Sequence, residues 1–116
     1  MEAFEISQLA RERERQNRPY LEFLRSASLS AGVYELPAGA IDPQQPHGED
    51  EVYYVIGGSA FIRVGAEDRE VRQGSIVFVK AHVEHRFHTI TEDLTVLVFF
   101  APAEYSLNPD GSGTGD

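Results

Sequence analysis

The chain has 116 residues, no cysteine and a formal net charge of −9 at pH 7. This length suits one small domain with its own core, and the absence of cysteine excludes disulfides and thiolate metal sites. No apolar stretch is long enough to span a bilayer, and residues 1–5 have neither the basic nor the apolar region of a signal peptide. We therefore expect a soluble, cytoplasmic protein with no membrane partner.

The negative charge is concentrated in one part of the chain. Residues 1–26 carry five basic and five acidic side chains, whereas residues 27–116 carry five and fourteen. An acidic body of this kind repels nucleic acid and anionic lipid surfaces. We therefore expect no nucleic-acid partner.

The N-terminal segment predicts a short helix over residues 7–16. Ser7 suits the N-cap position, and Pro19 cannot continue a helix. The arginines at positions 11, 13, 15 and 18 alternate with Glu12 and Glu14. This pattern is either a solvated helix face, which we favour, or an anion-binding arm.

Past Pro19 the sequence changes to short β-prone runs separated by turn residues. The expected strands are Tyr20–Leu24, Leu29–Leu36, Glu51–Ile56, Ala60–Val64, Arg69–Val71, Ser75–Val79, His85–Thr89 and Leu94–Ala101. Gly57 and Gly58 predict a hairpin, since glycine accepts a positive φ without strain, and Gly74 predicts a second tight reversal. Many short strands with glycine-rich turns indicate an all-β sandwich or barrel.

Three segments follow from these patterns. Residues 1–26 form an N-terminal helix and arm, residues 27–103 form one β-barrel, and residues 104–116 form a flexible C-terminal tail. The tail ends in a run of Gly, Ser, Thr, Asn, Pro and Asp without apolar side chains to bury.

The candidate functional residues begin just before the strand at Glu51. Side chains of a strand alternate between its faces, so residues two apart share a face. Gln45, His47 and Glu51 have the same parity and can point into one cavity if the segment is extended, and Tyr53 continues that face. Glu49 is the alternative carboxylate if the loop is adjusted.

A second group of histidines lies later in the chain. His85 shares a face with Phe87, whereas His88 takes the opposite face, and His82 falls in the preceding turn. We therefore expect His85 in the barrel interior, His88 on the exterior and His82 exposed.

Imidazole nitrogen, carboxylate oxygen and amide oxygen are all competent donors to a first-row divalent ion. Two histidines, one glutamate and one glutamine would leave one or two coordination positions open for water, dioxygen or substrate. An open position is what a catalytic metal site needs.

The spacing of these residues resembles the two motifs of the cupin family. The first motif is matched by Gly39, Gln45, His47, Glu51 and Gly58, with five, one, three and six residues between them. Fifteen residues later the second motif is matched by Gly74, Lys80, His82 and His85, with five, one and two residues between them. The departures are Gln45, where the family usually has histidine, and Lys80, His82 and Thr89, where Pro, Gly and Asn are usual.

The resemblance implies a double-stranded β-helix, or jelly-roll barrel, with a metal bound near one open end. By position it makes His47, Glu51 and His85 metal ligands. Gln45 is either a fourth ligand or a hydrogen-bond partner of bound water. The oxygen donors favour Mn, Fe(II), Ni or Zn over copper.

Three functions fit such a site. The first is a metal-dependent, dioxygenase-like enzyme acting on a small organic molecule, with Glu51 as a proton acceptor. The second is an isomerase, epimerase or lyase of sugars or small acids, in which Glu51 or Tyr53 transfers a proton. The third is a non-enzymatic module that binds or senses a small molecule.

The remaining expectations concern the core, the surface and assembly. The aromatic residues expected mainly in the core are Tyr53, Phe78, Phe87 and Phe99. Arg63 is either a solvated strand arginine or a group that binds a substrate carboxylate. The resemblance implies pairing through such strands, so we expect a homodimer that pairs through Tyr20–Leu24 and Leu29–Leu36 with the N-terminal segment contributing. Exposed sheet edges also need protection.

Overall fold

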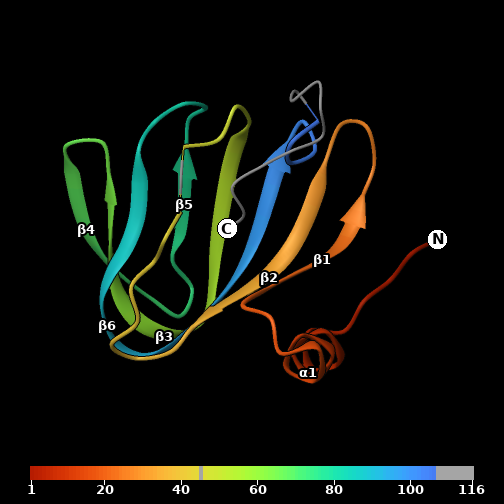
Figure 1. The fold of residues 1–116 in the computed structure, drawn as a ribbon, viewed down its shortest axis with the longest axis horizontal. Helices are drawn as coiled ribbons and strands as arrows, with labels where there is room; N and C mark the ends of the chain where they lie inside the picture. Colours follow the sequence, from red (N-terminus) through yellow and green to blue (C-terminus); the bar gives the residue numbers. More distant parts are fainter. Residues whose placement is uncertain (45, 107–116) are drawn as a thin grey trace.

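Two long, bent antiparallel strands form the centre of the fold (Figure 1). In this computed structural model, which describes residues 1–44 and 46–106, β3 spans Asp50–Val64 and β6 spans His85–Ala101. They pair along most of their length, from Asp50 opposite Ala101 to Val64 opposite His85. The two strands therefore connect one end of the fold to the other.

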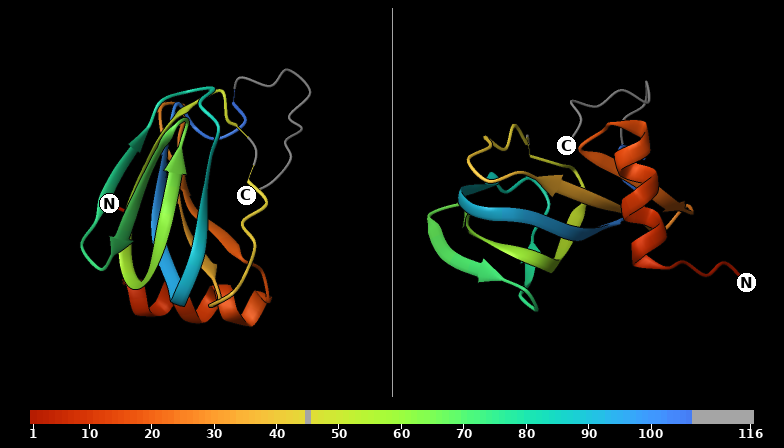
Figure 2. Two further views of the ribbon diagram at one scale, coloured as in Figure 1. Left: turned by 90° about the vertical axis from the view of Figure 1, so that its left-hand side faces the viewer. Right: turned by 90° about the horizontal axis from the view of Figure 1, so that it is seen from below.

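Four shorter strands complete an antiparallel sheet around this pair. They are β1 (Tyr20–Arg25), β2 (Ser30–Leu36), β4 (Glu67–Arg72) and β5 (Ile76–Val79). The order is β1-β2-β6-β3-β4, and β5 pairs with the first half of β3. Since β4 pairs only with the second half of β3, the sheet curls around an enclosed interior (Figure 2). The all-β jelly-roll prediction is confirmed.

The hairpin predicted at Gly57 and Gly58 is wrong, because β3 runs straight through both residues. Its pairing with β6 shifts register at three places between Val55 and Phe61, which marks bulges. Gly58 has a φ of +96°, and a Cβ there would collide with the Asp93 carbonyl oxygen. The glycine therefore serves a bend and a close approach of two strands, where the sequence suggested a reversal.

The prediction of two separate strands at His85–Thr89 and Leu94–Ala101 is also wrong, because both belong to one continuous strand, β6. By contrast, the reversal at Gly74 is confirmed. Gly74 lies between β4 and β5 with a φ of +93°, and its amide donates to the carbonyl of Val55 on β3.

Helix α1 spans Ile6–Gln16, one residue longer at its start than predicted. The N-cap is Glu5 and it makes no side-chain cap, so the assignment of Ser7 as N-cap is wrong. The helix lies against β1 and β2 (Figure 2), where Arg13 pairs with Glu35. In the described part of the chain, no helix is both long and apolar enough to cross a membrane.

The interior is filled by side chains from both halves of the curled sheet. The largest fully buried ones are Tyr34, Tyr53, Phe87, Phe100, Ile62 and Leu94. Tyr53 and Phe87 confirm the core prediction, and Phe99 is half-buried. Phe78 does not confirm it, because 59% of its surface is exposed. On β5, Val79 faces the core and Phe78 takes the alternate face.

Candidate metal centre

The loop between β2 and β3 delivers part of the site, and buried Asp42 holds this loop in place. The Asp42 carboxylate accepts hydrogen bonds from the Tyr34 hydroxyl at 2.8 Å, the Phe87 amide at 2.9 Å and the Gln44 side-chain amide at 2.8 Å. Farther along, the His82 amide donates to the His47 carbonyl at 2.7 Å. Because the loop is anchored to β2, β6 and the β5–β6 turn, the side chains it carries have defined positions.

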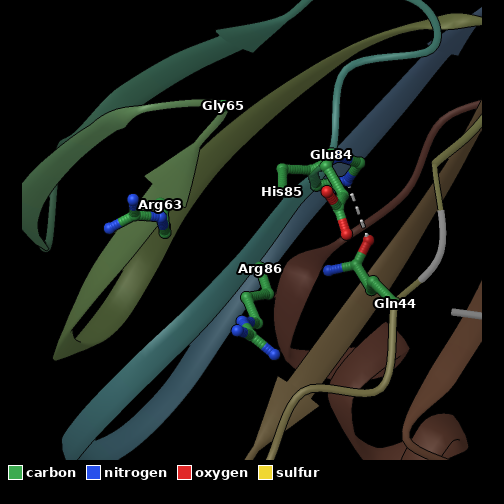
Figure 3. A pocket seen from close by; sticks show the side chains of 6 residues that line it. All are labelled: Gln44, Arg63, Gly65, Glu84, His85 and Arg86. Carbon is green, nitrogen blue, oxygen red and sulfur yellow. Dashed lines mark hydrogen bonds between the residues drawn. The ribbon is translucent and has the colours of Figure 1, made fainter.

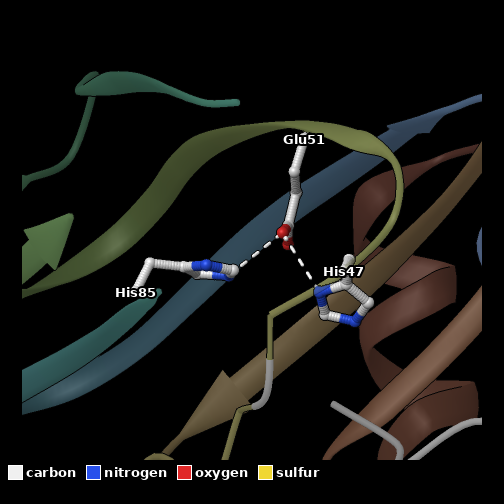
Figure 4. A group of neighbouring side chains, drawn as sticks. All are labelled: His47, Glu51 and His85. Carbon is white, nitrogen blue, oxygen red and sulfur yellow. Dashed lines mark ion pairs between the residues drawn. The ribbon is translucent and has the colours of Figure 1, made fainter. Parts of the chain in front are cut away.

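His47, Glu51 and His85 converge in the interior of the barrel (Figure 4). Each offers a donor atom, and these atoms lie within 4.8 Å of one another. Glu51 Oε1 is 3.1 Å from His85 Nε2 and 3.5 Å from His47 Nδ1. All three residues are buried, with exposed fractions of 5%, 1% and 5%. The structure thus brings together three of the four predicted ligands, in an arrangement that could hold a metal ion.

The hydrogen bonds of His85 show that a cation suits this position. Its Nδ1 lies 2.9 Å from the Val83 carbonyl oxygen, which can only accept, so Nδ1 carries the proton. In the neutral ring Nε2 is then an acceptor, yet it faces Glu51 Oε1 at 3.1 Å and Gln44 Oε1 at 3.3 Å. Nε2, Glu51 Oε1 and Gln44 Oε1 would then be three acceptors facing one another. This arrangement requires either a second proton, on Nε2, or a metal ion between the three atoms. The donor set therefore fits a divalent metal.

The pKa values of this pair reflect the same contact. Burial lowers the pKa of His85, but the neighbouring Glu51 carboxylate outweighs it and leaves that pKa raised. Burial raises the pKa of Glu51, but its contacts with His47 and His85 leave it lowered. Without a metal, the two groups therefore favour an ion pair.

Tyr53 lies beside the triad, fully buried. Its hydroxyl donates to Gln44 Oε1 at 2.7 Å. Burial, followed by the charge of Glu51, raises the pKa of Tyr53 well above its ordinary value. The phenol therefore remains protonated at neutral pH and acts as a hydrogen-bond donor.

Gln44 was not predicted as a site residue, whereas its neighbour Gln45 was. Gln45 lies outside the described residues. The Gln44 side chain reaches Tyr53 and His85, although its parity with His47 and Glu51 is wrong for an extended segment. The loop here is irregular, so alternation, the signal that selected Gln45, does not apply to Gln44.

Two more buried carboxylates surround His47. Glu104, from the segment after β6, places Oε2 3.1 Å from His47 Nε2. Glu49 is 3% exposed, and burial raises its pKa, which a backbone hydrogen bond from Tyr105 partly offsets. Residue 104 is the first of the predicted tail, and no motif spacing includes it.

A pocket of about 130 Å³ opens beside His85 (Figure 3). It is lined by Gln44, Arg63, Gly65, Glu84, His85 and Arg86. Arg63 on β3 and Arg86 on β6 are cross-strand partners, and both are exposed. They also line a larger neighbouring cavity of about 480 Å³. Two arginines thus line the pocket that reaches His85.

The other two histidines lie where the sequence predicts them, His82 from its place in a turn and His88 from strand alternation. His82 is exposed in the turn before β6. His88 is on the outer face, where Nε2 contacts Asp68 Oδ1 at 2.7 Å and its ring stacks on Phe61. Neither takes part in the triad.

Comparison with known proteins assigns the family. Residues 32–100 match the family model for the cupin domain, which is more than half of the chain. The chain belongs to the cupin family. This cupin is 50% identical over 104 residues to the uncharacterised protein SCO3923 of Streptomyces coelicolor, covering 90% of this chain and 99% of that protein.

Solved structures show the same fold. TT1209 from Thermus thermophilus superposes with a TM-score of 0.70 at 27% identity, covering 89% of the cupin and 99% of that chain. An RmlC-like cupin from Methanocaldococcus jannaschii, described as a double-stranded β-helix, gives a TM-score of 0.65 at 19% identity, covering 72% and 78%. These similarities confirm the predicted architecture.

Proposed function

We propose that this cupin binds a divalent metal ion through His47, Glu51 and His85 and acts as a metal-dependent enzyme on a small organic molecule. The observation that supports the proposal most is the buried convergence of the three donors within 4.8 Å. The mixed imidazole and carboxylate set suits Mn, Fe(II), Ni or Zn. Bound there, the ion would supply Lewis-acid polarisation or redox chemistry with dioxygen.

The chain's own groups then bind the substrate and control protons around that ion. Tyr53 holds a proton on its hydroxyl and can donate a hydrogen bond to a substrate oxygen that displaces Gln44. Glu51 is the carboxylate of the triad itself, and its lowered pKa keeps it ionised and able to accept a proton. The near-complete burial of the triad excludes bulk water from the reacting atoms. We propose Glu51 and Tyr53 as the catalytic residues.

Two reaction classes use such an arrangement. A dioxygenase-like reaction, the first candidate, needs an open metal position next to a pocket, and the pocket beside His85 favours it. An isomerase, epimerase or lyase reaction needs a proton donor and an acceptor on one substrate. The protonated Tyr53 beside the ionised Glu51 favours this second candidate.

Arg63 and Arg86 favour a substrate that carries a carboxylate. Like charges directly opposite on neighbouring strands destabilise a sheet, so their pairing calls for a compensating anion. Neither arginine is in an ion pair with an acidic side chain of the described part of the chain. Asp68, the cross-strand neighbour of Arg63, contacts His88 instead. We therefore propose that the substrate is a small organic acid.

Substrate panels separate the two reaction classes. Metal-loaded protein is assayed for oxygen uptake with catechols, enols, flavonols and diketones, and for turnover of sugar phosphates and small hydroxy acids. Oxygen uptake supports the dioxygenase-like reaction, and turnover without oxygen supports the alternative. Arg86→Gln should raise KM for an acidic substrate, whereas Arg69→Gln, outside the pocket, should not. If the protein takes up metal and a small molecule without turnover, it is a binding or sensor module.

We also propose that the cupin is a homodimer. β1 is an edge strand of the described sheet, and Ile76 and Phe78 expose an apolar face on β5. Gel filtration should give about twice the chain mass of 12.9 kDa, and elution as a monomer would contradict pairing.

A further inference from the structure

We propose that Glu104 is a positioning residue of the metal centre, which fixes the ring of His47 with Nδ1 turned toward Glu51 and His85. The inference rests on the proposed function, because it assigns a role toward the metal those residues would bind. Glu104 lies beyond residues 32–100, the part of the chain that matches the cupin domain. It therefore lies in the segment that follows β6, outside the part of the chain that carries the two motifs.

The contact between Glu104 and His47 is direct and buried. Glu104 Oε2 lies 3.1 Å from His47 Nε2, and the side chains are 5% and 3% exposed. An ionised carboxylate can only accept, so Nε2 carries the proton. The other ring nitrogen, Nδ1, then faces the triad, 3.5 Å from Glu51 Oε1, and its lone pair is available to a metal ion that takes the place of any proton between the two atoms.

The backbone around Glu104 is held from two sides, which aims the side chain at His47. The Glu104 amide donates to Ser30 Oγ at 2.8 Å, and its carbonyl accepts from Arg25 Nη2 at 2.6 Å. The Phe100 ring lies 4.9 Å from the His47 ring and restricts its rotation. β1 and β2 thus hold the backbone that carries the carboxylate, and β6 holds the ring that the carboxylate contacts.

The two histidines of the triad are held in the same manner. His85 donates from Nδ1 to the Val83 carbonyl, and His47 donates from Nε2 to Glu104. In each ring the outward nitrogen carries the proton and the inward nitrogen can bind a metal. Without Glu104, the His47 proton would favour Nδ1, because the Glu51 carboxylate offers an acceptor there. A protonated Nδ1 cannot bind a metal.

Glu104 is not itself in the ligand group. Among the described residues, the donor atoms that lie within 4.8 Å of one another come from His47, Glu51 and His85. Glu104 contacts the nitrogen of His47 that does not face Glu51. Its role is therefore to orient a ligand and to select its tautomer.

The test compares Glu104→Ala and Glu104→Gln with Glu70→Ala, an exposed glutamate on β4 as the matched control. Zn(II) and Mn(II) affinities are measured by calorimetry, and the ring ¹⁵N shifts of His47 are measured in the metal-free protein. We expect Glu104→Ala to weaken metal binding by about 10- to 100-fold and to move the proton toward Nδ1. The metal affinity of Glu104→Gln should lie between those of the wild type and Glu104→Ala, since its amide oxygen still accepts a hydrogen bond. The affinity of Glu70→Ala should match the wild type.

The two readouts keep the inference separate from the proposed function. If the wild type binds no metal, the proposed function fails, while the His47 tautomer still tests Glu104. If Glu104→Ala keeps both the metal affinity and the Nε2–H tautomer, the inference is overturned. If circular dichroism shows that Glu104→Ala does not fold, Glu104→Gln provides the test. A Glu104→Gln variant with wild-type metal affinity and an unchanged His47 ¹⁵N spectrum would overturn the role of the Glu104 carboxylate.

Discussion

His85 Nε2 lies 3.1 Å from Glu51 Oε1, and both side chains are almost fully buried. In the metal-free protein the contact favours a buried ion pair, because each group shifts the other's pKa, raising that of His85 and lowering that of Glu51. A buried pair of this kind repays its desolvation only while both partners are charged. Protons and a metal ion therefore compete for the same place.

The first prediction concerns the stability of the metal-free protein. A raised histidine pKa contributes stability below its ordinary value of 6.5, which is lost as pH rises through the folded pKa. A lowered glutamate pKa contributes stability above 4.5, which is lost as pH falls through the folded pKa. The difference in unfolding free energy between wild type and Glu51→Gln should therefore be largest between 4.5 and 6.5. Urea unfolding with chelator across pH measures it, and a pH-independent difference would contradict the pairing.

The second prediction concerns metal affinity. Because His85 must lose its extra proton to bind a metal, and its pKa is raised, affinity should fall as the solution becomes mildly acidic. Calorimetry in buffers of different ionisation enthalpy should detect proton release on binding below that pKa. Equal heats in all buffers at mildly acidic pH would show that His85 is already neutral or is not a ligand.

The third prediction tests the bend in β3 with two adjacent glycines. A Cβ on Gly58 would lie 2.7 Å from Leu94 Cα, at a φ of +96°, whereas a Cβ on Gly57 would meet nothing within 4 Å. Gly58→Ala should lower the free energy of unfolding by at least about 2 kcal/mol, and Gly57→Ala should lower it much less. Urea unfolding of both variants provides the comparison. Equal losses would mean that the close approach of β3 and β6 is not needed.

The fourth prediction concerns the hydroxyl of Tyr53. Tyr53→Phe removes the 2.7 Å hydrogen bond to Gln44 and should cost about 1 kcal/mol of stability. Metal affinity should hardly change, because the triad is intact. Turnover of any identified substrate should fall in kcat more than in KM. Unchanged turnover would remove Tyr53 from the catalytic residues.

Strand alternation and motif spacing identified much of this fold and site in advance. Glu51 and His85 lie in β3 and β6, where parity determines the face that a side chain takes, whereas His47 precedes β3 and was selected by the motif spacing as well. The same rule excluded His88, which lies on the outer face. The convergence of these side chains could therefore be anticipated, whereas their role as metal ligands stays a prediction.

The errors arose where contacts between distant parts of the chain determine the local structure. Gly57 and Gly58 have the composition of a hairpin, but packing against Asp93 and Leu94 makes them a bend within one strand. Gln44 enters the site through an irregular loop, and Glu104 returns to it from a distant segment. No local pattern reports a contact between residues 47 and 104, so such partners appear only in the structure.

The most direct test of the metal centre is the metal content and affinity of four proteins purified without chelator. Wild type and His82→Ala, which changes an exposed histidine outside the triad, should each bind about one divalent ion per chain. Glu51→Gln and His47→Ala should bind it more than about 100-fold more weakly, since the first replaces the charged carboxylate donor with a neutral amide and the second removes an imidazole ligand. A wild-type protein without bound metal, or a His47→Ala variant that binds as tightly as the wild type, would contradict the account.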